Sequence, residues 1–316
     1  MPSASTRALG RGHRAVTLAV CALFTGGCIS NKMVADTSFT VARAASIGVE
    51  TVQDYEGAEK MAYSGLAQLE SLHALSPENV DGLFLLVRAW TGVGQGFIMD
   101  EYERALERDD QPEANYQLLR ARAAFERAKQ YGLMLMALRA KGFEAATKND
   151  TTLRAWLVEH LRDKDLSQEL LWLGAAWLGR VQADSENAEV IADLWIGVEL
   201  VEHSVRLDET TEFGLGHVIL GAYHARAAIG EFEEAKQHFD RAMQINGGKY
   251  LPTQLQMAQR YYCQKHDKVG YDRSLNAVLD AVDPLPAARL ENTVAKRFAR
   301  RYQGNKRWQA ECGFGL

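Results

Sequence analysis

The chain of 316 residues is poor in cysteine and proline, with 4 and 6 of them respectively. No Cys-x-x-Cys motif occurs, and no cysteine stands beside a histidine at the spacing of a zinc site, so a structural metal is not indicated. Alternating β-branched runs are also missing, which excludes an extensive sheet. With so few prolines and 47% hydrophobic residues, the composition fits a well-buried globular body.

Motifs of catalysis are missing as well. The sequence contains no Gly-x-Ser-x-Gly and no His-Glu-x-x-His. The run Gly92-x-Gly94-x-Gly96 superficially resembles a phosphate loop, but no strand precedes it and no Lys-Ser/Thr follows. We interpret it as close helix packing. The sequence therefore predicts neither an enzyme nor a cofactor.

The N-terminus has the pattern of a bacterial lipoprotein signal. Three arginines precede the apolar run Ala15 to Thr25, which is too short to span a bilayer, and Gly26-Gly27-Cys28 follows. Small residues before the cysteine allow cleavage there, so we predict lipidation at Cys28. Thr25 departs from the Leu, Val or Ile usual at its position. The alternative is that Cys28 is an ordinary residue near a conventional cleavage site.

This signal sets the compartment and the charge of the mature chain. Ile29 and Ser30 after Cys28, instead of an aspartate, favour the periplasmic face of the outer membrane. Loss of the three signal arginines changes the net charge from −5 to −8. An acidic chain is a poor partner for nucleic acid, which selects clustered Lys and Arg. We therefore expect a membrane-tethered periplasmic protein with no nucleic-acid role.

Two cysteines remain after the signal. Cys21 lies in the discarded segment and Cys28 is the predicted lipid site, which leaves Cys263 and Cys312 in an oxidising compartment. A disulfide between them is one alternative and would fix the C-terminal tail to a helix. The other, which we favour, is a buried free Cys263 and a loose Cys312.

Apolar residues recur at intervals of three and four along the mature chain, so we predict an all-α fold of about a dozen helices of roughly 12 to 22 residues. Ser76-Pro77-Glu78 and Gln111-Pro112-Glu113 are predicted helix starts. Asn246-Gly247-Gly248 is a predicted helix end, and Asp283 to Pro286 separates the last two helices.

Two segments share a spacing typical of the second helix of a tetratricopeptide repeat. Alanines at its two ends allow close approach of neighbouring helices, and the aromatic between them fills the gap. Leu220 and Gly221 supply the first-helix signature before the later copy. We therefore predict an irregular tetratricopeptide-like helical solenoid. The two copies are Ala121, Phe125, Ala128 and Ala235, Phe239, Ala242.

These features together resemble one family. The segments RAAFERAKQYGLMLMALR from Arg122, LWLGAAWLGRV from Leu171, GHVILGAYHAR from Gly216 and ARLENTVAKRFARRY from Ala288 look like the TatT family, the helical T components of tripartite ATP-independent periplasmic (TRAP) transporters. The resemblance covers roughly residues 50 to 303. It implies cryptic tetratricopeptide-like repeats, a homotrimer, and the solute-binding component of the transporter as partner. It also implies a passage or cleft in each subunit for a hydrophobic or acid-bearing ligand.

The expected organisation is a signal peptide at 1–27, a tether and first helix at 28–49, a repeat-like helical domain at 50–303 and a tail at 304–316. The first functional hypothesis is an accessory lipoprotein that docks the solute-binding component and passes or holds a ligand. The second is a general scaffold lipoprotein that binds a polypeptide in envelope assembly.

Aromatic residues are the candidates for a ligand cleft, because they combine apolar area with a polar edge. Ordinary core packing is the alternative for each of them. Arg120, Arg122, Arg226 and Lys249 are candidate cations for an acidic ligand, or else surface helix residues. The candidate aromatic residues are Trp172, Trp177, Tyr223, Tyr250, Tyr261 and Tyr262.

Overall fold

The computed structural model describes residues 30–226 and 230–315. All regular elements in these two ranges are helical, which confirms the predicted all-α class. Twelve of the α-helices in this part of the chain have nine or more residues; eight of them have the expected 12 to 22 residues, three are shorter and one, with 29 residues, is longer. The predicted signal segment and Cys28 lie outside the described residues.

The N-terminal half includes one continuous helical run, Val80–Glu107, that is long and apolar enough to cross a membrane. Two thirds of its apolar window (67%) is buried inside the protein, as in a core helix. The elements of this half are α2 (Asn31–Ala45), α3 (Ile47–Glu50), α4 (Tyr55–His73), α5 (Val80–Val93), the π-helical turn η1 (Gly94–Ile98), α6 (Met99–Glu107), α7 (Gln111–Arg139), α8 (Phe143–Ala146) and α9 (Asp150–His160).

The C-terminal half contains a second π-helical turn, η4. Its elements are η2 (Lys164–Leu166), α10 (Ser167–Ala183), α11 (Ala188–Ala192), α12 (Leu194–Asp208), η3 (Thr211–Gly214), α13 (Leu215–His224), α14 (Phe232–Asn246), α15 (Pro252–Gln256), η4 (Met257–Tyr262), α16 (Lys268–Asp280), η5 (Pro286–Ala288), α17 (Arg289–Gly304) and α18 (Lys306–Glu311).

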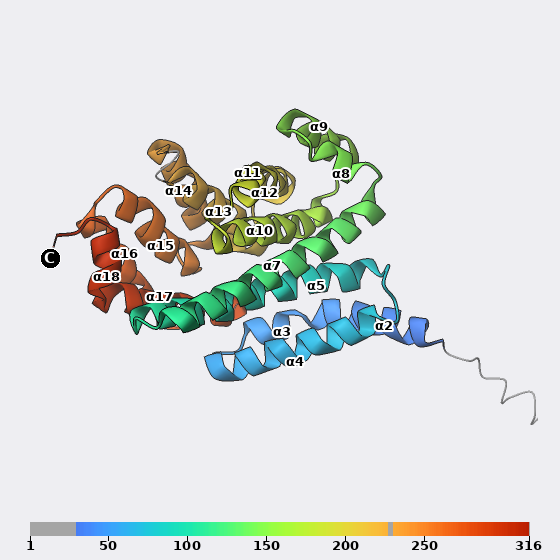
Figure 1. Ribbon diagram of the computed structural model, residues 1–316, viewed down its shortest axis with the longest axis horizontal. Coiled ribbons are helices and arrows are strands. Elements are labelled where there is room, and N and C mark those ends of the chain that lie inside the picture. The colour runs from blue at the N-terminus through green and yellow to red at the C-terminus, as the bar shows by residue number, and fades with distance from the viewer. Residues whose placement is uncertain (1–29, 227–229, 316) are drawn as a thin grey trace, which may run out of the picture.

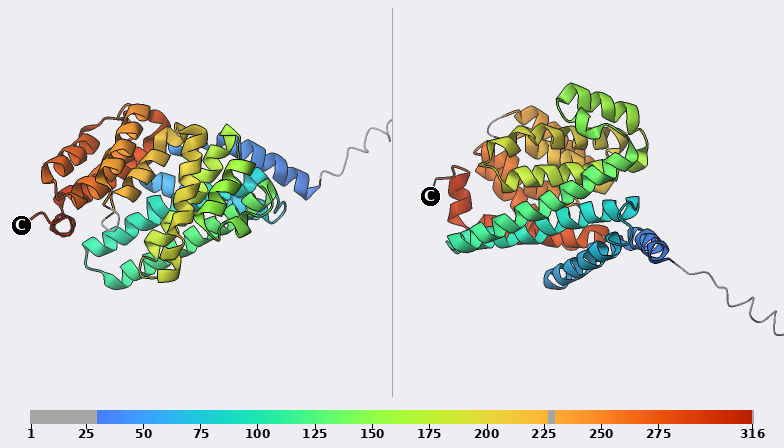
Figure 2. Two further views of the ribbon diagram at one scale, coloured as in Figure 1. Left: turned by 90° about the horizontal axis from the view of Figure 1, so that it is seen from above. Right: turned by 45° about the vertical axis from the view of Figure 1, so that its right-hand side comes forward.

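The long helix α7 runs across the molecule and organises the layers (Figure 1). Helices α5 and α10 both pack on α7, and α12 packs on α10. Helices α2 to α4 lie on one side of the layer formed by α5 and α7, and α10 to α14 lie on the other, as Figure 1 and the right-hand view of Figure 2 show. Helices α15 to α18 form one end of the molecule, far from the point where the chain enters α2.

Close helix packing depends on glycines that face the two repeated aromatic residues. A Cβ at Gly94 would lie 2.9 Å from the ring of Phe125, and one at Gly179 would lie 2.5 Å from it, so η1 and α10 approach α7 where side chains are missing. Phe239 meets Gly221 in the same way, at 3.0 Å. The repeat itself stays a prediction. Buried beside these aromatic residues are Leu220 and the alanines Ala121, Ala128, Ala235 and Ala242.

Most of the predicted helix ends are confirmed. Asp110 caps α7 with Pro112 in its first turn, and Gly247 ends α14 in a left-handed conformation. The prediction for Ser76 is wrong, because Asn79 caps α5 and accepts a hydrogen bond from the Gly82 N–H (2.8 Å). The buried Ser76 hydroxyl instead donates to Asp36 of α2 (2.6 Å), a long-range bond that no local pattern reveals.

Candidate functional site

A large cavity is lined by three groups of helices: α2, α4 and α5 from the N-terminal part, α10 and α13 from the middle, and α17 and α18 from the C-terminal part. Its volume is about 2210 Å³, more than twice that of a pocket for one drug-sized ligand, roughly 300–1,000 Å³. Most of the lining side chains are apolar. Four apolar residues on α2 and α4 line it and are also exposed to solvent, which marks an opening of the cavity there: Met33, Val34, Val41 and Met61.

Both π-helical turns belong to the cavity wall. The turn η1 contributes Gly96 and Phe97, and η4 contributes Gln259 and Arg260. Such turns interrupt the regular helix and are frequent at functional sites. The prediction of close packing holds for Gly94 but is wrong for the other two glycines of that run, since Gly92 and Gly96 face the cavity.

One arginine in the wall is neutralised by carboxylates. Arg88 on α5 pairs with Glu50 and lies 3.5 Å from Glu212. The Trp172 indole N–H donates to Glu212 at 3.3 Å. Glu212 and the next residue, Phe213, have left-handed φ angles of 48° and 59°, which are strained for non-glycine residues. We call Arg88, Glu50 and Glu212 the Arg88 cluster.

A carboxyl group with unusual protonation lies near this cluster. Burial, together with the nearby negative charge of Glu212, raises the pKa of Glu291 on α17 to about 7. Its Oε2 atom is enclosed and has no hydrogen-bond partner among the described residues. Burial also raises the pKa of Tyr250 well above its ordinary range. This part of the cavity therefore contains a group that changes charge near neutral pH.

Two further arginines line the cavity without such partners. The Arg226 guanidinium stacks over the ring of Tyr223, 4.4 Å from its centroid, and its Nε–H donates to the Tyr223 carbonyl (3.2 Å). Arg260 belongs to η4, which packs against α13. Burial lowers the pKa of Arg226, and the positive charge of Arg260 lowers it further. The charge of Arg260 acts on Arg226 across the contact of α13 and η4, and it also opposes the rise that burial causes in the pKa of Glu103 in the same cavity wall.

The wall between α6 and α17 is fixed by buried ion pairs. Asp100, which has no exposed surface, accepts hydrogen bonds from Arg301 (2.6 Å) and Arg297 (2.9 Å). Glu103 accepts from Arg301 (2.8 Å) and from the Tyr302 hydroxyl (2.9 Å). These bonds join residues about two hundred positions apart in the chain, so both halves of the protein are needed to form the cavity.

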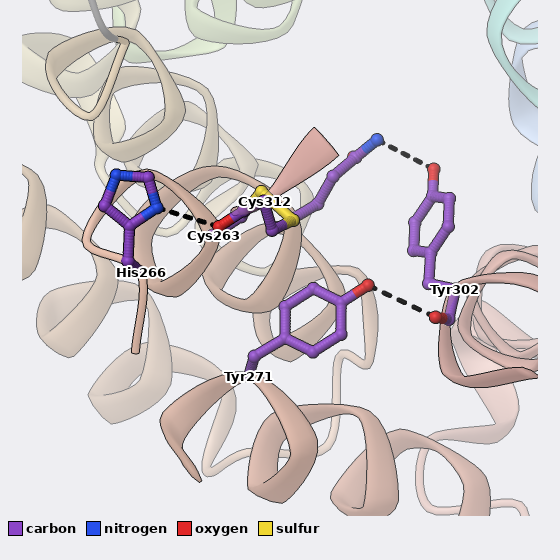
Figure 3. Close-up of a disulfide and its surroundings, with 6 residues drawn as sticks. Cys263, His266, Tyr271, Tyr302 and Cys312 are labelled. Carbon is purple, nitrogen blue, oxygen red and sulfur yellow. Dashed lines mark hydrogen bonds between the residues drawn. A yellow bond between two sulfur atoms is a disulfide. The ribbon is translucent and has the colours of Figure 1, made fainter. Parts of the chain in front are cut away.

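A disulfide closes the C-terminal end of the cavity (Figure 3). Cys263 at the end of η4 is bonded to Cys312, with a Cα–Cα distance of 4.7 Å, and both line the cavity. The prediction of a free Cys263 and a loose Cys312 is therefore wrong. The segment expected to be a tail folds back as α18, and the ring of His266 contacts the Cys312 carbonyl at 2.8 Å.

The structure divides the six candidate aromatic residues into two groups. Trp172, Tyr223 and Tyr250 line the cavity. Trp177 is buried in the main core, where the Lys129 ammonium group lies over its ring, 5.1 Å from the ring centroid. Tyr261 and Tyr262 pack on each other; Tyr261 also contacts Phe232 and Phe239 in a second core cluster, and Gly270 lies against Tyr262. The placement of Trp177, Tyr261 and Tyr262 among core side chains does not agree with their expected role as cleft residues.

Of the four candidate cations, only Arg226 lines the cavity. Arg120 donates to the Tyr63 hydroxyl (2.8 Å), and Arg122 donates to the Ala183 carbonyl (2.7 Å) and lies 3.3 Å from Asp184. The Lys249 carbonyl accepts a bond from Asn292, and its side chain is not part of the wall. Arg120 and Arg122 thus join neighbouring helices, whereas the Lys249 side chain is exposed in a loop.

Sequence reasoning missed several cavity residues. Arg88, Arg260 and Glu291 are among the charged residues of the wall, but each stands in a segment whose sequence is that of an ordinary amphipathic helix. Phe97 and Phe298 were equally indistinguishable from core residues. A local signal was available only near Phe97, where three alternate glycines are unusual inside a helix.

The fold and the site together define a class: an all-helical protein built around a long apolar cavity. No curated protein matches the chain in sequence. The family model described as TRAP transporter T-component matches residues 51–307, and the chain belongs to that family. The predicted family is therefore confirmed. It is a family of transporter components and not a known family of enzymes.

Proposed function

We propose that this protein is a periplasmic accessory lipoprotein of a TRAP transporter that docks the solute-binding component and holds or passes a hydrophobic or organic-acid ligand. The observation that carries the proposal is the cavity of about 2210 Å³ with mostly apolar walls, in a chain of the T-component family. Burial of each Å² of apolar ligand surface contributes roughly 25 cal/mol, so the binding energy grows with the apolar area that a ligand buries. A large apolar cavity therefore favours a long apolar molecule over a short one.

The proposal includes a lipid anchor at Cys28 on the periplasmic side of the outer membrane. Ser30 caps α2, which begins at Asn31, so a single residue separates Cys28 from the folded body. The exposed Met33 and Val34 lie in the first turn of α2, at the opening of the cavity. Each acyl chain contributes about 0.8 kcal/mol per buried methylene, so two or three chains hold the protein stably. The cavity opening would then lie near the bilayer.

The anchor is tested by replacing Cys28 with alanine. We expect the protein to move from the membrane fraction to the soluble periplasmic fraction, because no acyl chain remains to hold it. Persistence of the variant in the membrane would refute the anchor. Sucrose-gradient separation of the membranes of the unmodified strain then distinguishes the outer from the inner membrane.

Docking is tested by co-purification with the solute-binding component encoded beside the same transporter. We expect a stable complex at about 50 µM of each protein, a concentration that detects even weak interfaces. A solute-binding protein from an unrelated transporter is the control. If the cognate protein shows no complex at this concentration, the docking proposal is wrong.

Two further parts of the proposal have separate tests. The homotrimer, implied by the family, predicts a threefold mass by sedimentation of the unlipidated form, and a monomer at high concentration would contradict it. Ligand holding predicts that mass spectrometry of gently extracted protein detects a retained apolar molecule. Protein that is free of any such molecule after gentle extraction would count against ligand holding.

A further inference from the structure

Two of the arginines in the cavity wall lack the carboxylate partners that neutralise the others. Among the described residues, Arg88, Arg226, Arg260 and Arg307 line the cavity. Arg88 belongs to the Arg88 cluster, and Arg307 lies 3.3 Å from a carboxylate on its own helix. No described carboxylate forms an ion pair with Arg226 or Arg260. Glu103, on which the charge of Arg260 acts, is already bonded to Arg301 and to the Tyr302 hydroxyl. The segments outside the described ranges contain no aspartate or glutamate side chain.

The two unpaired arginines come from neighbouring elements. Arg226 follows the last turn of α13, and Arg260 lies in η4, which contacts α13. Stacking on Tyr223 fixes the guanidinium plane of Arg226, and only its Nε–H is used, by the Tyr223 carbonyl. The Nη groups of Arg226 and the whole guanidinium of Arg260 have no hydrogen-bond acceptor among the described residues. Several donors therefore remain available at one place in the wall.

Half-buried cations beside apolar walls are unfavourable without a counter-charge, and two of them repel each other. An anion placed between them removes both costs. The planar guanidinium suits an oxyanion with two or more acceptor oxygens, such as a carboxylate or a phosphate. The polar Gln256 and Gln259 stand near Arg260 in the cavity wall, while Leu255 and Phe298 continue the wall as apolar surface.

We infer that Arg226 and Arg260 form a subsite for the oxyanion head of an amphiphile, whose apolar tail lies along the rest of the cavity. This inference rests on the proposed function, in which the cavity holds a ligand, and adds the position and charge of its head group. The Arg88 cluster does not serve this role because its arginine is already paired. The protein thus selects long-chain acids over neutral lipids of the same length.

The test uses a pair of fluorescent probes that differ only in the head: dansyl-undecanoic acid and its methyl ester. Binding is measured by fluorescence with the Cys28→Ala protein, which avoids detergent. We expect the acid to bind at least about tenfold more tightly than the ester, because a hydrogen bond to a charged group contributes roughly 1.5–3 kcal/mol. Displacement of the acid probe by dodecanoate or by dodecyl phosphate then identifies the preferred oxyanion.

Variants locate the subsite. The double variant R226Q/R260Q is expected to bind acid and ester equally, with the ester affinity unchanged. Arg260→Lys keeps the charge and is expected to keep a preference for the acid. The matched control Arg289→Gln removes a cation that is paired with Asp283 outside the cavity wall, and should leave the preference intact. Because two like charges are removed, the double variant should unfold at the same temperature as the parent or a higher one.

Three results would overturn the inference. Equal binding of acid and ester by the Cys28→Ala protein, in which both arginines are present, refutes the subsite but leaves the cavity as a binding site for apolar ligands. A preference for acid that survives in R226Q/R260Q places the head group elsewhere. Binding of neither probe refutes the subsite together with the proposed ligand holding.

Discussion

The disulfide between Cys263 and Cys312 gives a stability prediction that can be worked out from the fold. It closes a loop with a sequence separation of 49 residues. By the chain-entropy relation, a loop of this length restricts the unfolded chain enough to contribute about 4 kcal/mol at 25 °C. Replacing both cysteines by alanine removes this restriction and leaves no unpaired thiol. We therefore expect the C-terminal helices to lose about 4 kcal/mol of stability.

Urea unfolding measures this loss. Circular dichroism reports all helices, while fluorescence includes the signal of Trp308, which lies in the linked segment α18. A loss of this size lowers the urea midpoint by roughly 1 M, since slopes are about 1–3 kcal/mol per M for small proteins and lie at or above the upper end for a chain of this size. The parent protein in reductant is the control, and it should unfold like the double variant.

Two results would refute this reasoning. Equal midpoints of the parent and the C263A/C312A variant would show that the loop does not limit the unfolded chain. Thiol titration of the unfolded, unreduced parent that detects both cysteines would show that the protein as isolated contains no bridge.

Three other predictions follow from buried groups. Asp100→Asn removes the carboxylate that pairs with Arg301 and should cost about 3–5 kcal/mol of thermal stability; an effect below about 1 kcal/mol would contradict a buried ion pair. Glu291 has a pKa of about 7 in the folded state and near 4.5 when unfolded. The folded state therefore binds its proton more tightly, and the free energy of unfolding should fall as pH rises between these values. Glu291→Gln should remove that slope, and an unchanged pH profile would disprove the assignment. Phe125→Ala leaves a void against Gly179 and should cost about 3–5 kcal/mol in urea unfolding; a loss under about 1 kcal/mol would show that the helices close over the gap.

Local signals were enough to predict the helical class and most helix ends. A proline in the first turn and a glycine after the last residue act within one helical turn, so Pro112 and Gly247 could be interpreted directly. Ser76 shows the limit, because its hydroxyl bonds to Asp36 across 40 positions and leaves the cap to Asn79. The bridge between Cys263 and Cys312 depends equally on how α18 folds back.

The site was harder to predict, since a cavity wall and a core wall have the same composition. Trp172 and Trp177 stand on the same helix, yet only Trp172 faces the cavity, while the other is enclosed by core residues. Helical spacing shows that two side chains point in different directions, but not which direction is empty. The charges of Arg260 and Glu291 become meaningful only when the surrounding helices are known.

The ion pairs between α6 and α17 also set the order in which the protein can be completed. Asp100 and Arg301 are separated by 201 positions, so their contact forms only after α17 has arrived. Long-range contacts form late in folding because loop closure must come first. Until α17 has arrived, the apolar cavity faces of the N-terminal helices therefore remain uncovered. A chain cut short before Arg289 would keep these faces exposed to water, so the last helices act as the cover of the cavity as well as part of its wall.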